Sequence, residues 1–185
     1  MEQKITILGI PGSLRKGSFN KALLEAATEL LPNDAVLEIF GLDGIPLYNQ
    51  DLEKDPPERV RQFKEKIKAA DALLLATPEY NYSIPGVLKN AIDWASRPHG
   101  NKVFHDKPLA IMGASMGMFG SARAQYHLRQ CFISLNAHIL NQPEIMVPSA
   151  HDKIDVNGRL TDEKTRGLIG ELLVALVAWT RRLKF

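Results

Sequence analysis

Strand-like and helix-like patterns of apolar residues alternate five times along this 185-residue chain. The clearest strand-like pattern is the run Asp-Ala-Leu-Leu-Leu-Ala-Thr at residues 71–77, which is continuously apolar at its centre and stops at Pro78. Such a run is typical of a strand that is buried on both faces of a parallel sheet. The alternation therefore predicts an α/β protein, in which helices connect parallel strands.

The spacing of the apolar residues places each expected element. Strands are expected at residues 4–9, 35–40, 71–77, 109–113 and 137–140, with residues 145–147 as a continuation of the fifth strand or as its alternative. Helices are expected from about residue 18 to Pro32, from Pro56 to about residue 70, from about Pro85 past Trp94, over residues 121–136 and over residues 162–183. The pattern contains no repeat and no linker, so residues 1–185 are expected to form a single domain.

Five strands connected by helices favour a doubly wound parallel sheet, and right-handed crossovers place helices on both of its faces. The natural strand order is 2-1-3-4-5, the flavodoxin-like order. In that order the chain changes direction between strands one and three, which leaves a crevice at the carboxyl ends of the strands where ligands bind. We therefore expect the loops after strands one and three to line a ligand site, with the loop after strand four beside them.

Charge and composition exclude several classes of protein. The 23 Lys and Arg residues against 21 Asp and Glu residues give a net charge of +2, too small for the dense basic face that nucleic acid requires. The longest apolar run is far shorter than the roughly 18 residues of a membrane span. The one cysteine, Cys131, cannot form a disulfide within the chain, and no export leader precedes the first strand. We expect a cytoplasmic protein without nucleic-acid or membrane partners.

The loop after the first expected strand gathers anion-binding groups within eight positions. Ser13 and Ser18 offer hydroxyls, Asn20 offers an amide and Arg15 offers a planar cation. Free backbone N–H groups at the start of the following helix would complete a cradle suited to a phosphomonoester. Ser18 is also expected to cap that helix, which is compatible with phosphate binding. The alternative is a purely structural loop in which Arg15 is solvated.

The loop after the third expected strand reads Thr-Pro-Glu-Tyr-Asn-Tyr-Ser-Ile-Pro-Gly at residues 77–86. Tyr80 and Tyr82 can present their faces or edges to a planar ring, and Glu79 and Asn81 can meet the polar edge of such a ring. The alternative is that the tyrosines cover the end of the sheet or form a subunit contact.

These two loops resemble those of the NAD(P)H-dependent FMN reductases. The segments that carry the resemblance are Gly-Ser-Leu-Arg-Lys-Gly-Ser-Phe-Asn at residues 12–20 and Pro-Glu-Tyr-Asn-Tyr-Ser-Ile-Pro-Gly-Val-Leu-Lys-Asn-Ala-Ile-Asp-Trp at residues 78–94. Within that family they are most similar to the bacterial quinone and chromate reductase branch. The resemblance implies an FMN-phosphate cradle formed by Ser13, Arg15, Lys16, Gly17, Ser18, Phe19 and Asn20. It also implies a flavin-ring segment formed by Pro78, Glu79, Tyr80, Asn81 and Tyr82, with Ser115 as a contact from the third loop.

By the same resemblance, the protein would pass a hydride from NADPH or NADH through bound FMN to a quinone, or to chromate, an azo compound or free flavin. No catalytic acid, base or nucleophile is required, because the reaction belongs to the cofactor. Family members are usually dimers or tetramers, so a homodimer or homotetramer is expected. A flavodoxin-type electron carrier or a flavin-regulated interaction protein stays open as an alternative, although carriers are typically strongly acidic and this chain is not.

Two competing signals carry less weight. The segment Gly-Ala-Ser-Met-Gly at residues 113–117 matches the G-x-S-x-G nucleophile elbow of serine hydrolases. An acid followed by a histidine must come after that serine, and only Glu144 with His151 fits. His127 and Cys131 are spaced i, i+4 on an expected helix, but a zinc site needs more ligands, so no metal is expected.

Overall fold

The computed structural model of the chain describes residues 4–183. Its strands form one parallel sheet in the order β2-β1-β3-β4-β5, with β6 paired to the carboxyl half of β4. The strands are β1 (Ile5–Pro11), β2 (Ala35–Ile39), β3 (Ala72–Ala76), β4 (Pro108–Ala114), β5 (His138–Ile139) and β6 (Ile145–Val147). The predicted flavodoxin-like 2-1-3-4-5 order is confirmed.

The fifth position of the sheet is shared by two short strands. β5 pairs with Pro108 and Leu109 at the start of β4, whereas β6 pairs with residues 112–114 at its end. Between them the chain leaves the sheet and passes through Pro143, which has no N–H to donate to a ladder. The two expected segments, residues 137–140 and 145–147, therefore both contribute to the fifth position, because the strand is interrupted and then resumes.

Four α-helices connect these strands, namely α1 (Phe19–Glu29), α2 (Glu58–Ala69), α3 (Gly86–Ser96) and α4 (Ala122–Cys131), and α5 (Glu163–Leu183) follows β6. Short 3₁₀ turns lie at η1 (Gln50–Leu52) and η2 (Ala150–Asp152). The expected helix over residues 121–136 is shorter in the structure and ends at Cys131. The N–H groups of Phe132 and Ile133 donate to carbonyl oxygens only three residues earlier, at 3.2 and 3.3 Å, and residues 132–136 form turns. Such bonds tighten the last turn of a helix and end it.

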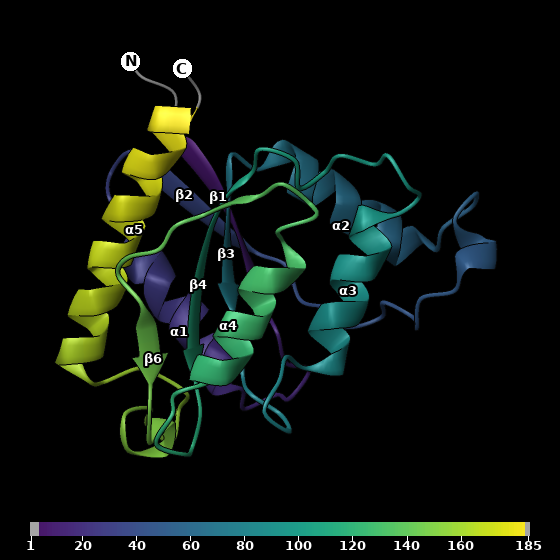
Figure 1. Cartoon of the computed structure of the whole chain (residues 1–185). Coiled ribbons are helices and arrows are strands. Elements are labelled where there is room, and N and C mark those ends of the chain that lie inside the picture. Colours follow the sequence, from purple (N-terminus) through teal and green to yellow (C-terminus); the bar gives the residue numbers. More distant parts are fainter. Residues whose placement is uncertain (1–3, 184–185) are drawn as a thin grey trace.

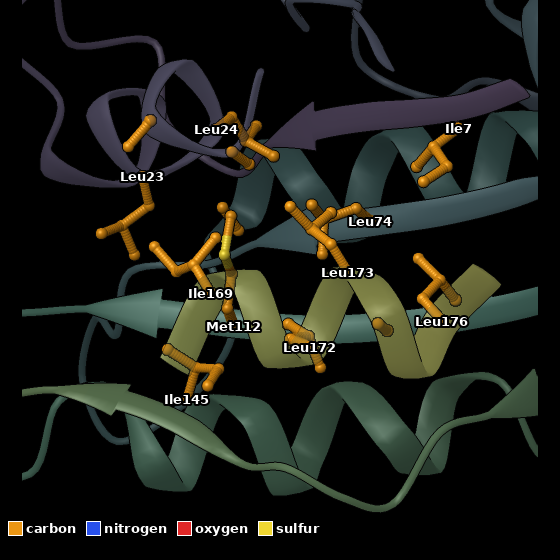
Figure 2. Packing of buried hydrophobic residues seen from close by; sticks show 14 of the residues in the cluster. Ile7, Leu23, Leu24, Leu74, Met112, Ile145, Ile169, Leu172, Leu173 and Leu176 are labelled. Atoms are coloured by element: carbon orange, nitrogen blue, oxygen red, sulfur yellow. The ribbon is translucent and has the colours of Figure 1, made fainter. Parts of the chain in front are cut away.

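Side chains alternate between two apolar cores along each buried strand. In β3, Leu74 faces α1 and α5, whereas Leu73 and Leu75 face the opposite core that includes Phe63 of α2 and Phe132 after α4. Figure 2 shows the first core, where Leu172, Leu173 and other residues of α5 pack against the sheet. Figure 1 shows the resulting layers, with α5 and α1 on one side of the sheet and α2, α3 and α4 on the other. The predicted covering of both faces is confirmed.

The carboxyl ends of the strands point to the lower edge of the view in Figure 1, where the connecting loops gather. Gly12 lets the chain leave β1 close to β3: its N–H donates to the Ala76 oxygen at 2.8 Å, and an added Cβ would lie 3.1 Å from Leu88 and 3.3 Å from Pro78. A glycine is favoured where two segments approach this closely. The first and third loops therefore start side by side.

Among the helices of the described part of the chain, none combines the length and the apolar character that a membrane crossing requires.

Candidate functional site

A cavity of about 450 Å³ opens at the carboxyl ends of β1, β3 and β4. Volumes of this order are usual for small-molecule sites. Its walls come from the three loops that the strand order predicted, and the lining residues are Ser13, Arg15, Ser18, Phe19, Asn20, Pro78, Glu79, Tyr80, Ala114, Ser115, Met116 and Gly117. Of the predicted site residues, Lys16, Gly17, Asn81 and Tyr82 lie outside this lining set.

The first wall is the loop that enters α1. Ser18 is the N-cap of this helix, and its hydroxyl oxygen accepts a hydrogen bond from the Lys21 N–H at 3.3 Å. The Ser13 hydroxyl accepts from the Arg15 N–H at 3.2 Å, and the Arg15 guanidinium lies 4.8 Å from the centre of the Phe19 ring. The first N–H groups of a helix have no partner within the helix and attract anions. This wall therefore combines a helix amino terminus, two hydroxyls and a cation.

Asn20 is placed differently from the prediction of an amide donor to phosphate. Its side chain is buried, its Nδ2 donates to the Ala114 oxygen at 3.0 Å, and its Oδ1 accepts from the Ala114 N–H at 2.9 Å. Both ends of the amide are thus engaged within the protein. Asn20 holds the start of α1 against the end of β4, so the first and third walls of the cavity are connected directly.

The second wall is a tight turn after β3. Tyr80 and Ser83 exchange backbone hydrogen bonds of 3.1 and 3.0 Å across Asn81 and Tyr82, whose φ angles are 49° and 66°. Two successive positive φ angles are the signature of a type I′ hairpin turn. The turn leaves Tyr80 in the cavity wall and places Tyr82 at its tip, outside the cavity.

Glu79 lines the cavity, and its carboxylate is engaged by α4. Its side chain is only 7% exposed, and its Oε2 accepts from the backbone N–H groups of Arg123 and Ala124 at 3.0 and 3.2 Å. Its Oε1 pairs with the Arg123 guanidinium. A carboxylate at the amino terminus of α4 is favourable, and this pairing raises the pKa of the Arg123 guanidinium. Glu79 thus connects the second loop to α4.

The third wall follows β4. The Ser115 hydroxyl donates to the Gly117 oxygen at 3.1 Å, and its N–H donates to the Val147 oxygen at 3.1 Å. Gly113 is required by packing, because an added Cβ would lie 2.0 Å from the Ser121 hydroxyl oxygen and 2.4 Å from the Thr77 oxygen. The first glycine of the G-x-S-x-G pattern therefore has a structural cause here, the close approach of the β3 and β4 ends.

Lys16 and Gly17 border a neighbouring hollow on the other side of the α1 amino terminus, facing the turn at residues 154–158. Ser18 and Phe19 line both hollows. Lys16 and Gly17 thus stand at the rim between the two rather than inside the cavity.

Arg123 contacts the cavity-lining Glu79 and was not predicted from the sequence. Its guanidinium lies 3.6 Å from the centre of the Tyr82 ring and 4.5 Å from that of Phe119. No local pattern marks this role, because Glu79 is 44 positions away in the sequence. Met116 and Gly117 belong to the glycine-rich loop that the sequence placed beside the site.

Within residues 4–183, no three His, Cys, Asp or Glu side chains come together as a group that could hold a metal ion. Cys131 is partly buried, and burial raises the pKa of its thiol.

The cavity fits a phosphomonoester attached to a flat ring system. The helix terminus, the Ser13 and Ser18 hydroxyls and the Arg15 cation lie at one wall, and the Pro78 and Tyr80 side chains lie at another. These are the groups that bind, respectively, a dianion and a planar aromatic. FMN has this composition.

Comparison with known proteins gives the same assignment. Residues 5–152 match the family model described as NADPH-dependent FMN reductase. The chain is 55% identical over 185 residues, the full length of both proteins, to an NAD(P)H-dependent FMN reductase of Pseudomonas aeruginosa. It is 46% identical over 181 residues, 98% of each protein, to 2-hydroxy-1,4-benzoquinone reductase of a Burkholderia species.

The structural similarity extends over the same length. FerB, a flavoenzyme NAD(P)H:(acceptor) oxidoreductase from Paracoccus denitrificans, superposes with a TM-score of 0.88 at 36% identity, over 96% of this chain and 98% of FerB. With the family model matched over most of the sequence, this chain belongs to the NADPH-dependent FMN reductase family and is an FMN-dependent oxidoreductase.

Proposed function

We propose that this protein uses NAD(P)H to reduce a quinone or a similar small acceptor, with FMN held in the cavity at the carboxyl ends of β1, β3 and β4. The observation that supports this most directly is the joining, in one cavity, of an anion cradle at the start of α1 and an aromatic wall after β3. FMN, when bound, supplies the redox chemistry by taking a hydride from the nicotinamide and passing electrons to the acceptor.

The first wall would hold the phosphate. Arg15 would supply a charged donor, Ser13 and Ser18 would supply hydroxyl donors, and the first N–H groups of α1 would complete the set. Lys16 at the rim would add positive charge without a direct contact. Asn20 would act through Ala114, by keeping the phosphate end of the cavity in register with the third loop.

The other two walls would orient the ring. Pro78 and Tyr80 present apolar surface to the cavity, and Ser115, Met116 and Gly117 lie across from the cradle. Backbone N–H groups in these loops are suited to stabilise negative charge on the ring, since donors that are already fixed need no reorganisation. None of these side chains has to move a proton in this scheme.

Five apolar side chains of the second loop, the third loop and α4 are exposed, namely Tyr82, Met116, Met118, Phe119 and Tyr126. Exposed apolar side chains that gather on a surface often mark a contact with another molecule. We propose that Met118 and Tyr126 form part of a homodimer or homotetramer contact. The single free thiol is compatible with a cytoplasmic location.

The proposed reaction is tested by mixing FMN-loaded protein with NADPH or NADH without oxygen. Loss of flavin absorbance, followed by its return on addition of 1,4-benzoquinone, supports it. If neither nicotinamide bleaches the flavin, yet a separate reductase protein does, the chain acts as an electron carrier and the proposal is rejected. Substituting chromate or an azo dye for the quinone in the second step compares the candidate acceptors.

A further inference from the structure

The Glu79 carboxylate is satisfied by α4 alone. Its Oε2 receives two backbone N–H groups and its Oε1 pairs with the Arg123 guanidinium, while the side chain is almost fully buried. A charged hydrogen bond at a buried site is strong, and leaving one partner unpaired is costly. The second loop and the start of α4 are therefore fastened together at one carboxylate.

Arg123 extends this link to two aromatic rings from different loops. Tyr82, at the tip of the second loop, lies 3.6 Å from the guanidinium, and Phe119, in the third loop, lies 4.5 Å from it. Such distances are typical of cation–π contacts. Tyr82 is 68% exposed and Phe119 is 56% exposed, so the core does not fix either ring. Their position depends on Arg123, and the position of Arg123 depends on Glu79.

The aromatic pair is close along the chain to two segments of the cavity wall. Glu79 and Tyr80 belong to one of these segments, and Met116 and Gly117 belong to the other. Tyr82 comes two residues after Tyr80, and Phe119 comes two residues after Gly117.

We propose that Glu79 and Arg123 act as one positioning unit, which holds Tyr82 and Phe119 so that a planar aromatic acceptor can dock at the mouth of the cavity. This unit is distinct from the phosphate cradle, and it assigns Glu79 to the acceptor rather than to direct contact with FMN. The inference rests on the proposed function, because it names the residues that position the acceptor at the same site.

The first test is the variant Glu79→Gln, compared with wild type. Loss of the charge and of one acceptor oxygen is expected to lower kcat/KM for 1,4-benzoquinone about tenfold. The Kd for FMN, measured by titrating the apoprotein, is expected to rise by a smaller factor than kcat/KM falls, because the phosphate cradle is untouched and only the loop that carries Pro78 and Tyr80 is loosened. A matched control is Glu58→Gln on α2, which removes an exposed carboxylate paired with Arg61 at 3.0 Å and is expected to change neither value.

A second test measures the mobility of the two loops directly and does not require enzyme turnover. Hydrogen exchange of the apoprotein is expected to rise in peptides covering residues 78–84 and 117–124 of Glu79→Gln, and to stay unchanged in α2 and α5. Arg123→Gln is expected to give the same changes. The double variant is expected to add little to either single variant, since residues that work as a unit are not additive.

The outcomes separate this inference from the proposed function. If wild-type protein fails to reduce benzoquinone, the proposed function fails, and the exchange data still show whether the loops are held by Glu79. If Glu79→Gln weakens FMN binding as much as it lowers kcat/KM, Glu79 contacts the flavin and the inference is overturned. It is also overturned if the variant dissociates the oligomer with no change in kcat/KM at saturating protein concentration, or if exchange in both loops is unaltered.

Discussion

Arg15 is the one charged side chain that lines the cradle wall of the cavity, where it stacks on Phe19. Arg15→Ala removes a charge-assisted donor, so FMN is expected to bind more weakly by about 1.5–3 kcal/mol. Fluorescence titration of the apoprotein with FMN measures this. Lys21→Ala is the control, because Lys21 carries the same charge nearby and pairs with Glu25 at 3.4 Å. An equal loss of FMN affinity in both variants would indicate a general electrostatic attraction and not a direct contact of Arg15 with the phosphate.

The prediction for Asn20 concerns a different quantity, the stability of the apoprotein. Asn20→Ala leaves the buried N–H and oxygen of Ala114 without their partners, and the free energy of unfolding is expected to fall by about 2–3 kcal/mol. Urea denaturation without FMN measures it. Ser13→Ala, which touches only the exposed Arg15 N–H, is expected to change stability by less than about 0.5 kcal/mol. Wild-type stability of Asn20→Ala would contradict the role given to this amide.

At this scale the sequence predicted which residues gather but not what each one touches. Ser18 could be identified as a cap because a cap contacts residues within one turn. Asn20 and Glu79 could not be assigned to Ala114 and Arg123, because these partners lie 94 and 44 positions away. The sequence shows that an amide or a carboxylate is present, whereas the fold decides whether it faces a ligand or another loop.

The elements were predictable where one local pattern dominated. Strand β3 and helix α5 follow the expected ranges closely, since the apolar pattern of each is strong and Pro78 follows β3 as a clear stop signal. Helix α4 and the split between β5 and β6 were less predictable. Helix α4 ends at Cys131, where the chain tightens into turns, and the backbone oxygen of Asn136 at the end of these turns accepts from the distant Asp106 N–H at 2.9 Å, a contact that no local pattern indicates.

The start of α5 gives a prediction about pH. Asp162 accepts hydrogen bonds from the Thr165 N–H at 2.8 Å and from the Thr165 hydroxyl at 2.5 Å, and these bonds lower the pKa of its carboxyl. Because the native pKa lies below the unfolded value near 4, this stabilisation is complete above about pH 4 and is lost as the pH falls through the native pKa. Asp162→Ala is expected to lose about 1 kcal/mol at pH 7.

Urea denaturation of Asp162→Ala and wild type at pH 7 and at pH 3 checks both statements. The difference between the two proteins is expected to be smaller at pH 3. Asp162→Asn is the control, because an amide oxygen can cap the helix at every pH. A difference that is unchanged across this range would show that the ionised carboxylate is not the source of the stabilisation.

At the scale of the whole molecule, the exposed side chains of Met118 and Tyr126 make up the proposed contact patch, and this patch predicts association. Wild-type protein is expected to run as a dimer or tetramer in size-exclusion chromatography with light scattering. Met118→Glu places a charge in the exposed patch and is expected to shift the protein toward the monomer. Val156→Glu is the control, because Val156 is fully exposed and lines the neighbouring hollow and not the cavity. A wild-type monomer at micromolar concentration would exclude this contact.

Because the cavity is built from three loops that start at three different strands, ligand binding should stabilise the whole fold. A ligand that binds only the native state at 100 times its Kd adds about 2.7 kcal/mol. For a chain of this length that corresponds to a rise in Tm of about 5–10 °C. Thermal unfolding of the apoprotein with and without FMN measures the rise.

Riboflavin, which lacks the phosphate, is expected to give a much smaller rise in Tm at the same concentration. Arg15→Ala is expected to reduce the rise with FMN only. Equal shifts with FMN and riboflavin would show that the start of α1 does not hold a phosphate.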